Sequence, residues 1–204
     1  GDVYKRQVQQ VDGGGLIVDK AEASVFGNQE EDIRKMFHTN RNSAVILLNG
    51  SPVDMTGWIN SASAVLEAWY PGEQGAQAIC EILFGDYSPS GKIPVSVPKN
   101  VGQLPLFYAH KPSGRGYHYN ENDGNPFYPF GYGLSYTTFG FGSFSRCIKE
   151  GEILISFVLE NTGHYDGTEV VQVYVSGRNC DVVMPVKELK AYRRVTLLSL
   201  IHIS

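Results

Sequence analysis

The sequence predicts a partial, doubly wound α/β layer with a mostly parallel sheet, followed by an incomplete all-β sandwich. Three observations support this fold class. Two continuous apolar runs, at residues 43–48 and 63–69, alternate with helical patterns in the first part of the chain. A long stretch rich in proline and aromatic residues follows, up to about residue 136. From about residue 137 the apolar pattern takes a period of two, which is typical of strands with one buried face.

The first element of the predicted layer is a helix over residues 28–38. Ile33 and Phe37 are four residues apart in this segment and share one apolar face. The runs "SAVILL" (43–48) and "SAVLEAW" (63–69) come next. Continuous apolar runs of this length suit strands that are buried on both faces, as they are in a parallel sheet.

A second helix is predicted over residues 73–85. Gly85 suits the position just after its end, because glycine adopts the left-handed conformation of a C-terminal cap. We expect Cys80 to be a small buried side chain on the apolar face of this helix. "KIPVSV" (92–97) is expected to add an edge strand to the layer, where proline is tolerated. The apolar face has helical spacing and consists of Ala76, Ile79, Cys80 and Leu83.

Three segments in the last third of the chain have the pattern of short antiparallel strands. They are "EILISFVLENTG" (152–163), "TEVVQVYVSG" (168–177) and "PVKELKAYRRVTL" (185–197), and "ENTG" and "HYDG" supply turn residues. These strands predict a sandwich that stops short of about seven strands. We therefore expect open strand edges and an open core face, and poor solubility or partial unfolding beyond residue 137.

Composition narrows the classes of partner. The net charge is −4 and the isoelectric point is near 5.7, so no nucleic-acid partner is expected. No apolar run reaches the roughly 20 residues of a membrane span, so no membrane partner is expected. The three cysteines lack a metal-binding spacing, so they indicate neither a zinc site nor a disulfide framework.

Five motifs occur together and in a fixed order between about residues 26 and 197. In order they are "AVILLNGSPVDM", "AWYPGEQGAQAICEILFGDYSPSGKIPVSVP", "VGQLPLFYAHKPSGR", "PFYPFGYGLSYTTF" and "ENTGHYDGTEVVQVYV" with "PVKELKAYRRV". This series resembles glycoside hydrolase family 3 of the β-glucosidase and β-xylosidase type. The resemblance implies the end of that family's α/β domain, then a truncated immunoglobulin-like sandwich of the fibronectin type III kind.

The resemblance also implies a mechanism. Family members are similar to retaining exo-glycosidases, which use two carboxylates to remove terminal β-linked glucose or xylose without a metal or organic cofactor. The aspartate nucleophile is expected in an N-terminal TIM barrel outside this chain, and the barrel would be its intramolecular partner. The chain alone is therefore expected to be inactive. Glu22 is the candidate acid/base in the stretch before the first helix, and the alternative is a surface glutamate.

The resemblance divides the chain into five parts. Residues 8–98 are expected to be the end of the α/β domain, 99–136 an ordered linker and 137–197 the truncated fibronectin type III-like domain. Residues 1–7 and 198–204 resemble sequencing-adapter tails and are not expected to be native. The compartment is left open between bacterial cytoplasm, periplasm and secretion.

Three further residues are candidates for the border of a substrate cleft. Asp54 and Trp58 follow the first predicted strand, and ligand crevices in open α/β sheets lie beyond the carboxyl ends of strands. The alternative for Asp54 is to anchor its own loop. Trp69 could stack on a sugar ring or pack in the core. For the whole chain, the alternative function is a non-catalytic carbohydrate-binding or scaffolding module.

Overall fold

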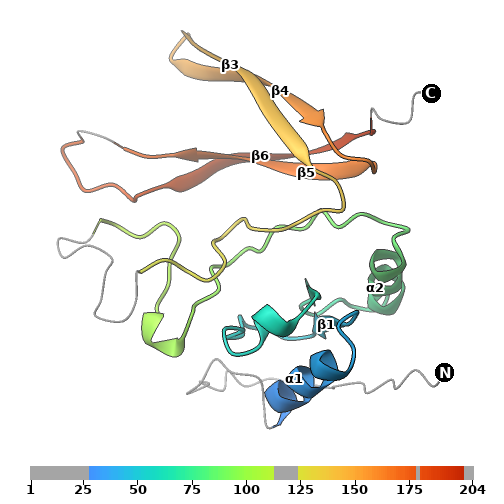
Figure 1. The fold of residues 1–204 in the computed structure, drawn as a ribbon. Helices are drawn as coiled ribbons and strands as arrows, with labels where there is room; N and C mark the ends of the chain where they lie inside the picture. The colour runs from blue at the N-terminus through green and yellow to red at the C-terminus, as the bar shows by residue number, and fades with distance from the viewer. Residues whose placement is uncertain (1–27, 113–123, 178–179, 200–204) are drawn as a thin grey trace. The chain divides into compact units, whose positions relative to one another are not determined.

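The structure is a computed structural model that describes residues 28–112, 124–177 and 180–199 (Figure 1). It divides into two compact units, which we name by their content. The α/β unit comprises the described residues of 1–80 and 94–130, and the sandwich unit comprises those of 81–93 and 131–204. The five-part division expected from the sequence has other boundaries and stays a prediction.

The α/β unit contains a pair of parallel strands, one whole helix and the first part of a second helix. Strands β1 and β2 are hydrogen-bonded in parallel, with Ala44 opposite Ala64 and Leu47 opposite Glu67, so both strands end at the same edge. This confirms the parallel pairing that the two apolar runs predict. The helices and strands begin and end as follows: α1 Gln29–Thr39, β1 Ala44–Leu47, η1 Ile59–Ser61, β2 Ala64–Glu67, α2 Gly75–Phe84 and η2 Val101–Gln103.

The core of the α/β unit lies where α1 and the loop after β1 bury their apolar side chains. Ile33 and Phe37, one turn apart on α1, are both buried, which confirms the predicted apolar face. Trp58 is only 1% exposed, and the side chains of β1 alternate in burial. The other buried apolar residues of this unit are Val45, Leu47, Val53, Met55 and Val97.

Helix α2 forms where it is predicted, but its apolar face is not covered. Gly85 follows the helix with a φ of +84°, which confirms its role at the C-terminal end. Cys80 is exposed, so the expectation of a buried thiol is wrong. Leu83 is 44% and Phe84 82% exposed. The helical spacing of apolar residues identifies a face, but it does not supply the element that would cover that face.

The expected edge strand over residues 92–97 does not form. Val97 makes an isolated antiparallel bridge with Tyr128, in which its N–H donates to the Tyr128 carbonyl at 2.9 Å. Ile93 belongs instead to the sandwich unit. Pro94 and Pro98 flank this bridge and have no N–H to donate, so a continuous ladder cannot develop.

The sandwich unit consists of two antiparallel hairpins (Figure 1). Strand β3 (Phe139–Lys149) pairs with β4 (Glu152–Asn161), and β5 (Gly167–Val175) pairs with β6 (Glu188–Leu197). Strands β4, β5 and β6 confirm the three segments with alternating apolar residues. Strand β3 carries a register shift between Gly142 and Ser145.

The sandwich unit also includes the segment 81–93, which precedes the long linker in sequence. Lys92 Nζ lies 3.0 Å from Glu169 Oε1 of β5, and both side chains are largely buried, at 16% and 14% exposed. Lys92 Nζ also donates to the Gly133 carbonyl at 2.8 Å. A Cβ at position 133 would overlap the Gly91 carbonyl, so glycine permits this close approach. Polar contacts therefore hold this segment to the strands.

Candidate functional site

The carboxyl edge of β1 and β2 holds a cluster of polar side chains. Asn49 follows β1 by two residues and is 1% exposed. Its Nδ2 donates to the Ser51 carbonyl at 2.7 Å and to Glu67 Oε2 at 3.4 Å. Glu67 is the last residue of β2, and its Oε1 accepts a hydrogen bond from the Trp69 N–H at 3.2 Å. One carboxylate therefore connects the loops that follow both strands.

Glu67 is a carboxyl group in a partly desolvated position. Burial raises the pKa of Glu67 above its ordinary value of 4.5, although the Trp69 N–H and the Asn49 amide oppose that shift. Desolvation disfavours the charged form, whereas hydrogen bonds donated to the carboxylate favour it. Carboxyl groups with this kind of perturbation occur often at functional sites.

Trp69 adopts a backbone conformation that is unusual for a bulky residue. Its φ is +49°, in the left-handed region, and its side chain is half-buried. For a residue with a Cβ this region costs about 1–2 kcal/mol. Such conformations persist where surrounding contacts hold them, and they gather at functional sites. Here the contact is the hydrogen bond from the Trp69 N–H to Glu67.

Tyr70 extends the contact between the two loops. A Cβ at position 50 would lie 2.8 Å from carbons of the Tyr70 ring, so Gly50 is needed for the ring to take this place. Tyr70 is 67% exposed. The edge thus combines a carboxylate with two successive aromatic residues, one half-buried and one exposed.

Buried polar atoms without a partner lie in the same unit. No hydrogen-bond partner among the described residues reaches Asn49 Oδ1 or Trp58 Nε1. Buried polar groups are nearly always paired, because an unmade hydrogen bond costs the desolvation of the group. Asn49 Oδ1 is therefore a buried acceptor at the carboxyl edge that no described side chain or backbone group satisfies.

The structure places the predicted site residues in different settings. Asp54 Oδ1 accepts hydrogen bonds from Thr56 N at 2.9 Å and Thr56 Oγ1 at 2.6 Å, which is the geometry of a loop anchor. Trp58 is buried in the core. Trp69 lies at the carboxyl edge with Glu67. Glu22 lies outside the described residues. The cleft-border role of Asp54, Trp58 and Trp69 stays a prediction.

Asn49 and Glu67 are the site residues that sequence reasoning missed. Each is polar and comes at or just after the end of an apolar run, in "LLNG" and "VLEAW". Because the carboxyl ends of parallel strands lie at one edge, this shared position is a signal that both side chains meet there.

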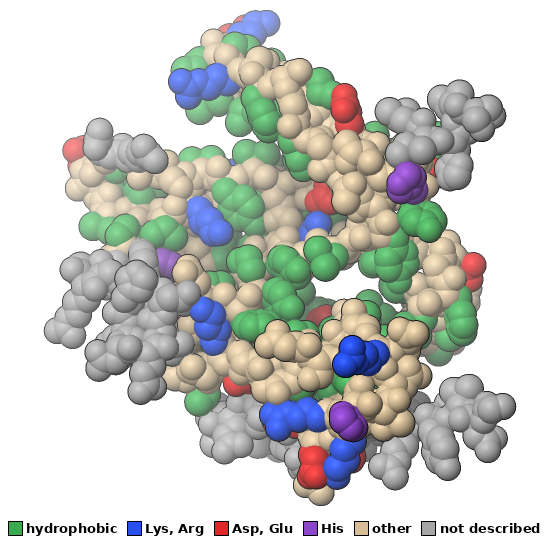
Figure 2. Space-filling view, viewed as in Figure 1, with side chains coloured by type: hydrophobic (Ala, Val, Ile, Leu, Met, Phe, Trp, Pro, Cys, Tyr) green, Lys and Arg blue, Asp and Glu red, His purple; other side chains and the backbone are tan. Residues whose placement is uncertain are grey.

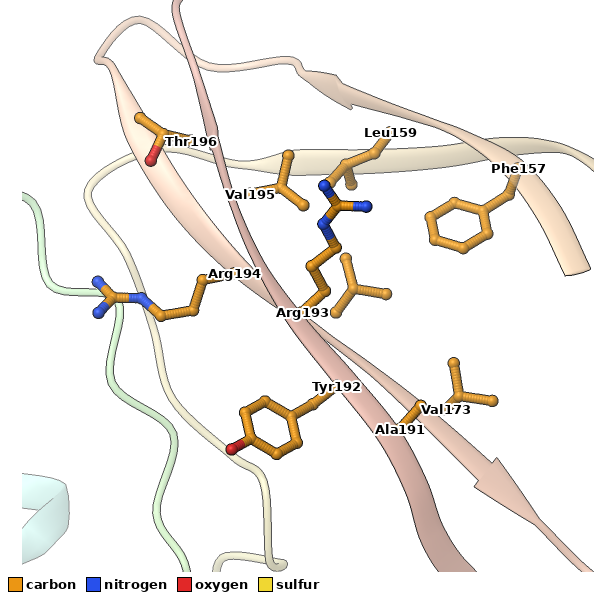
Figure 3. A pocket seen from close by; sticks show the side chains of 10 residues that line it. Phe157, Leu159, Val173, Ala191, Tyr192, Arg193, Arg194, Val195 and Thr196 are labelled. Atoms are coloured by element: carbon orange, nitrogen blue, oxygen red, sulfur yellow. The ribbon is translucent and has the colours of Figure 1, made fainter.

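An open hollow of about 750 Å³ lies between strands of the sandwich unit. Figure 3 shows Phe157 and Leu159 of β4 across from Val173 and Val195, with the Arg193 side chain between them. The lining is mainly aliphatic, and few polar groups converge on it. Ligand sites combine an apolar wall with precisely placed polar groups. We interpret this hollow as loosely filled core between the two hairpins.

In the part of the chain that the structure describes, no group of three or more His, Cys, Asp or Glu side chains is placed to hold a metal ion. Neither described α-helix has the length and apolar character needed to cross a membrane.

Comparison with family models identifies the chain. The glycosyl hydrolase family 3 C-terminal domain matches residues 3–136, which is more than half of the sequence. The chain belongs to glycosyl hydrolase family 3. A fibronectin type III-like domain matches residues 169–199, within the sandwich unit. The family resemblance and the fold class that the motifs predict are therefore confirmed.

Individual family 3 relatives agree with this assignment. The chain is 37% identical over 184 residues to a periplasmic β-glucosidase of Salmonella typhimurium, covering 83% of the chain and 24% of that protein. It is 36% identical over 187 residues to a β-xylosidase of Formosa agariphila, covering 88% of the chain and 26% of the relative. The chain thus spans about a quarter of the length of these relatives.

Solved structures of family 3 enzymes share the fold. A β-glucosidase from Erythrobacter marinus matches with a TM-score of 0.83 and 37% identity, over 89% of this chain and 24% of that one. A β-glucosidase from Listeria innocua, solved with glucose, matches with a TM-score of 0.81 and 31% identity, over 88% and 27% of the two chains.

Proposed function

We propose that the complete protein is a retaining exo-glycosidase that hydrolyses terminal β-linked glucose or xylose from oligosaccharides and glycosides. The observation that carries this proposal is the family 3 match over residues 3–136, shared with relatives named β-glucosidase and β-xylosidase. In such enzymes one carboxylate attacks the anomeric carbon, and a second protonates the leaving oxygen and then activates water.

In this proposal the chain supplies an edge of the substrate cleft rather than the nucleophile. The aspartate nucleophile belongs to a TIM barrel that acts as the intramolecular partner of the α/β unit. The carboxyl edge of β1 and β2, with Trp69 and Tyr70, is suited to border the sugar, because aromatic rings stack on the C–H faces of pyranosides. The cleft-border roles of Asp54 and Trp58 belong to the same proposal.

A chimera tests the proposed function. In it, this chain replaces the segment that it matches in the Salmonella β-glucosidase. We expect the chimera to release nitrophenol from a nitrophenyl β-glucoside or β-xyloside, with the β-anomer as the first sugar product. The isolated 204-residue chain is the matched control and is expected to release none.

Two results would contradict this function. Hydrolysis by the isolated chain would show that it carries its own nucleophile. A soluble, folded chimera without activity, together with tight sugar binding by the isolated chain in a calorimetric titration, would favour the carbohydrate-binding module instead.

A further inference from the structure

Glu67 is a half-buried carboxylate that joins two loops of the α/β unit. It contacts the loops after both parallel strands, through Asn49 and the Trp69 N–H. An apolar residue at the end of β2 would avoid the desolvation of a charge. A glutamate nevertheless stands here, next to a tryptophan with a left-handed backbone.

The hydrogen bond to the Trp69 N–H is made two residues along the same chain. A carboxylate that accepts a backbone N–H at this spacing closes a local turn, as Asx-type turns do. An ionised oxygen accepts such a bond more strongly than a neutral one. The left-handed conformation of Trp69 is therefore tied to the charge state of Glu67.

We infer that Glu67 is a positioning residue, whose ionised carboxylate holds Trp69 in its left-handed conformation so that the indole borders a bound pyranoside ring. The sugar part of this inference rests on the proposed function, whereas the link between Glu67 and Trp69 does not. Asn49 holds the other carboxylate oxygen and so fixes the direction of the group.

The pKa of Glu67 determines the pH at which the hydrogen bond from the Trp69 N–H to its carboxylate weakens. The influences on that pKa are burial, the Trp69 N–H and the Asn49 amide, and none of them is a charged group. Because burial raises the pKa above 4.5, the carboxylate takes up its proton at a higher pH than an exposed glutamate does. Trp69 is then held less strongly.

Tryptophan fluorescence of the 204-residue chain tests the link directly. The chain has two tryptophans, so Trp58→Phe leaves Trp69 as the single reporter. We expect its emission to follow a one-proton transition with a midpoint above 4.5 and to lose that transition in Glu67→Gln. Glu73→Gln, at an exposed glutamate in the same loop, is the matched control and should keep it.

Because Trp58 lies in the core, its replacement could unfold the unit. In that case the Trp69 signal is obtained as the difference between the native chain and Trp69→Phe, with helical circular dichroism to show that both are folded. A transition that survives unchanged in Glu67→Gln overturns the inference.

The sugar part is measured in the chimera. Glu67→Gln should raise KM for a nitrophenyl β-glucoside about five-fold while kcat changes by less than about two-fold, because a bordering aromatic contributes mainly to binding. An unchanged KM overturns the sugar role. Loss of activity in the chimera with the native Glu67 contradicts the proposed function, and the fluorescence result would remain valid.

Discussion

The two units stabilise their strands in different ways. In the α/β unit, β1 and β2 are four residues long, and their surroundings bury Phe37, Leu47 and Trp58. In the sandwich unit the strands are nine to eleven residues long, yet Ile153 on β4 is 68% exposed. Long hydrogen-bonded ladders therefore do not indicate a well-covered core. Side-chain burial dominates in the first unit, and backbone ladders with polar contacts dominate in the second.

The largest effect should come from the core of the α/β unit. Phe37→Ala is expected to lower the free energy of unfolding by about 3–5 kcal/mol, because it leaves a cavity beside buried neighbours. Ile153→Ala removes an exposed side chain and should cost less than about 1 kcal/mol. Urea denaturation of both variants measures the difference. Equal losses would contradict the contrast between the units.

The second largest loss of stability should come from breaking the ion pair between Lys92 and Glu169. Lys92→Ala leaves the Glu169 carboxylate largely buried without its ion-pair partner, which should cost about 3 kcal/mol. Lys190→Ala is the matched control, because the pair of Lys190 with Glu188 is exposed and worth about 0–1 kcal/mol. The two variants are compared by thermal unfolding of the sandwich unit.

A double variant sharpens this result. Replacing both partners, as Lys92→Met with Glu169→Leu, removes the uncompensated charge and should recover most of the lost stability. If Lys92→Ala behaved like Lys190→Ala, the segment 81–93 would not be held to the strands by this ion pair.

Periodicity was sufficient to predict most elements of the fold. The spacing of Ile33 and Phe37 gave α1, and alternation in residues 152–163 gave β4, because each pattern reflects the repeat of its own backbone. The sequence pattern did not predict strand β3. Its apolar alternation breaks after Phe141, where Gly142 and Ser143 precede Phe144, and this break coincides with the register shift between Gly142 and Ser145.

The wrong and missing predictions concern contacts between elements that are distant in the sequence. Cys80 has a helical apolar pattern around it, but coverage of that face depends on other elements. The partner of Glu67 is Asn49, 18 residues earlier, and this contact follows from the parallel register rather than from either local sequence. Sequence reasoning pointed to the loop after β1 through Asp54 and Trp58, but it did not single out Asn49 and Glu67, whose contact depends on the register of the two strands.

Replacement of Glu67 should change the free energy of unfolding by a smaller amount. The sign of that change distinguishes a positioning role from a structural role. Because burial raises the pKa of Glu67, the folded state binds the proton more tightly than the unfolded state does. The stability that protonated Glu67 contributes is fully present below pH 4.5 and is lost as the pH rises through the folded-state pKa. Glu67→Gln should therefore be slightly more stable than the native chain at pH 7.

Chemical denaturation between pH 4 and pH 8 measures this dependence, with Glu73→Gln as the exposed control. A lower stability for Glu67→Gln at pH 7, with no change in its pH dependence, would show that the carboxylate serves the fold itself. That outcome would also weaken the contrast between a buried apolar core and a polar edge kept for function.

The smallest effect on stability should come from the exposed face of the β3–β4 hairpin. Phe144, Ile148 and Ile153 are 69%, 77% and 68% exposed, and hydrophobic side chains are visible over this hairpin at the top of Figure 2. Ile153→Lys should change the free energy of unfolding by less than about 0.5 kcal/mol. It should nevertheless raise solubility and reduce the binding of an apolar dye, because exposed apolar strands promote association.

Ser145→Lys separates the two causes of such a gain. Ser145 is exposed on β3 of the same hairpin, so this variant adds the same charge without removing apolar surface. If Ile153→Lys alone lowers dye binding, the apolar face limits solubility. If both variants improve solubility equally, the added positive charge on the hairpin is the cause rather than the loss of apolar surface, because charged side chains on exposed strands oppose association. The chain starts at −4, so each added lysine reduces its net charge, and a gain from Ser145→Lys would then require local rather than global repulsion.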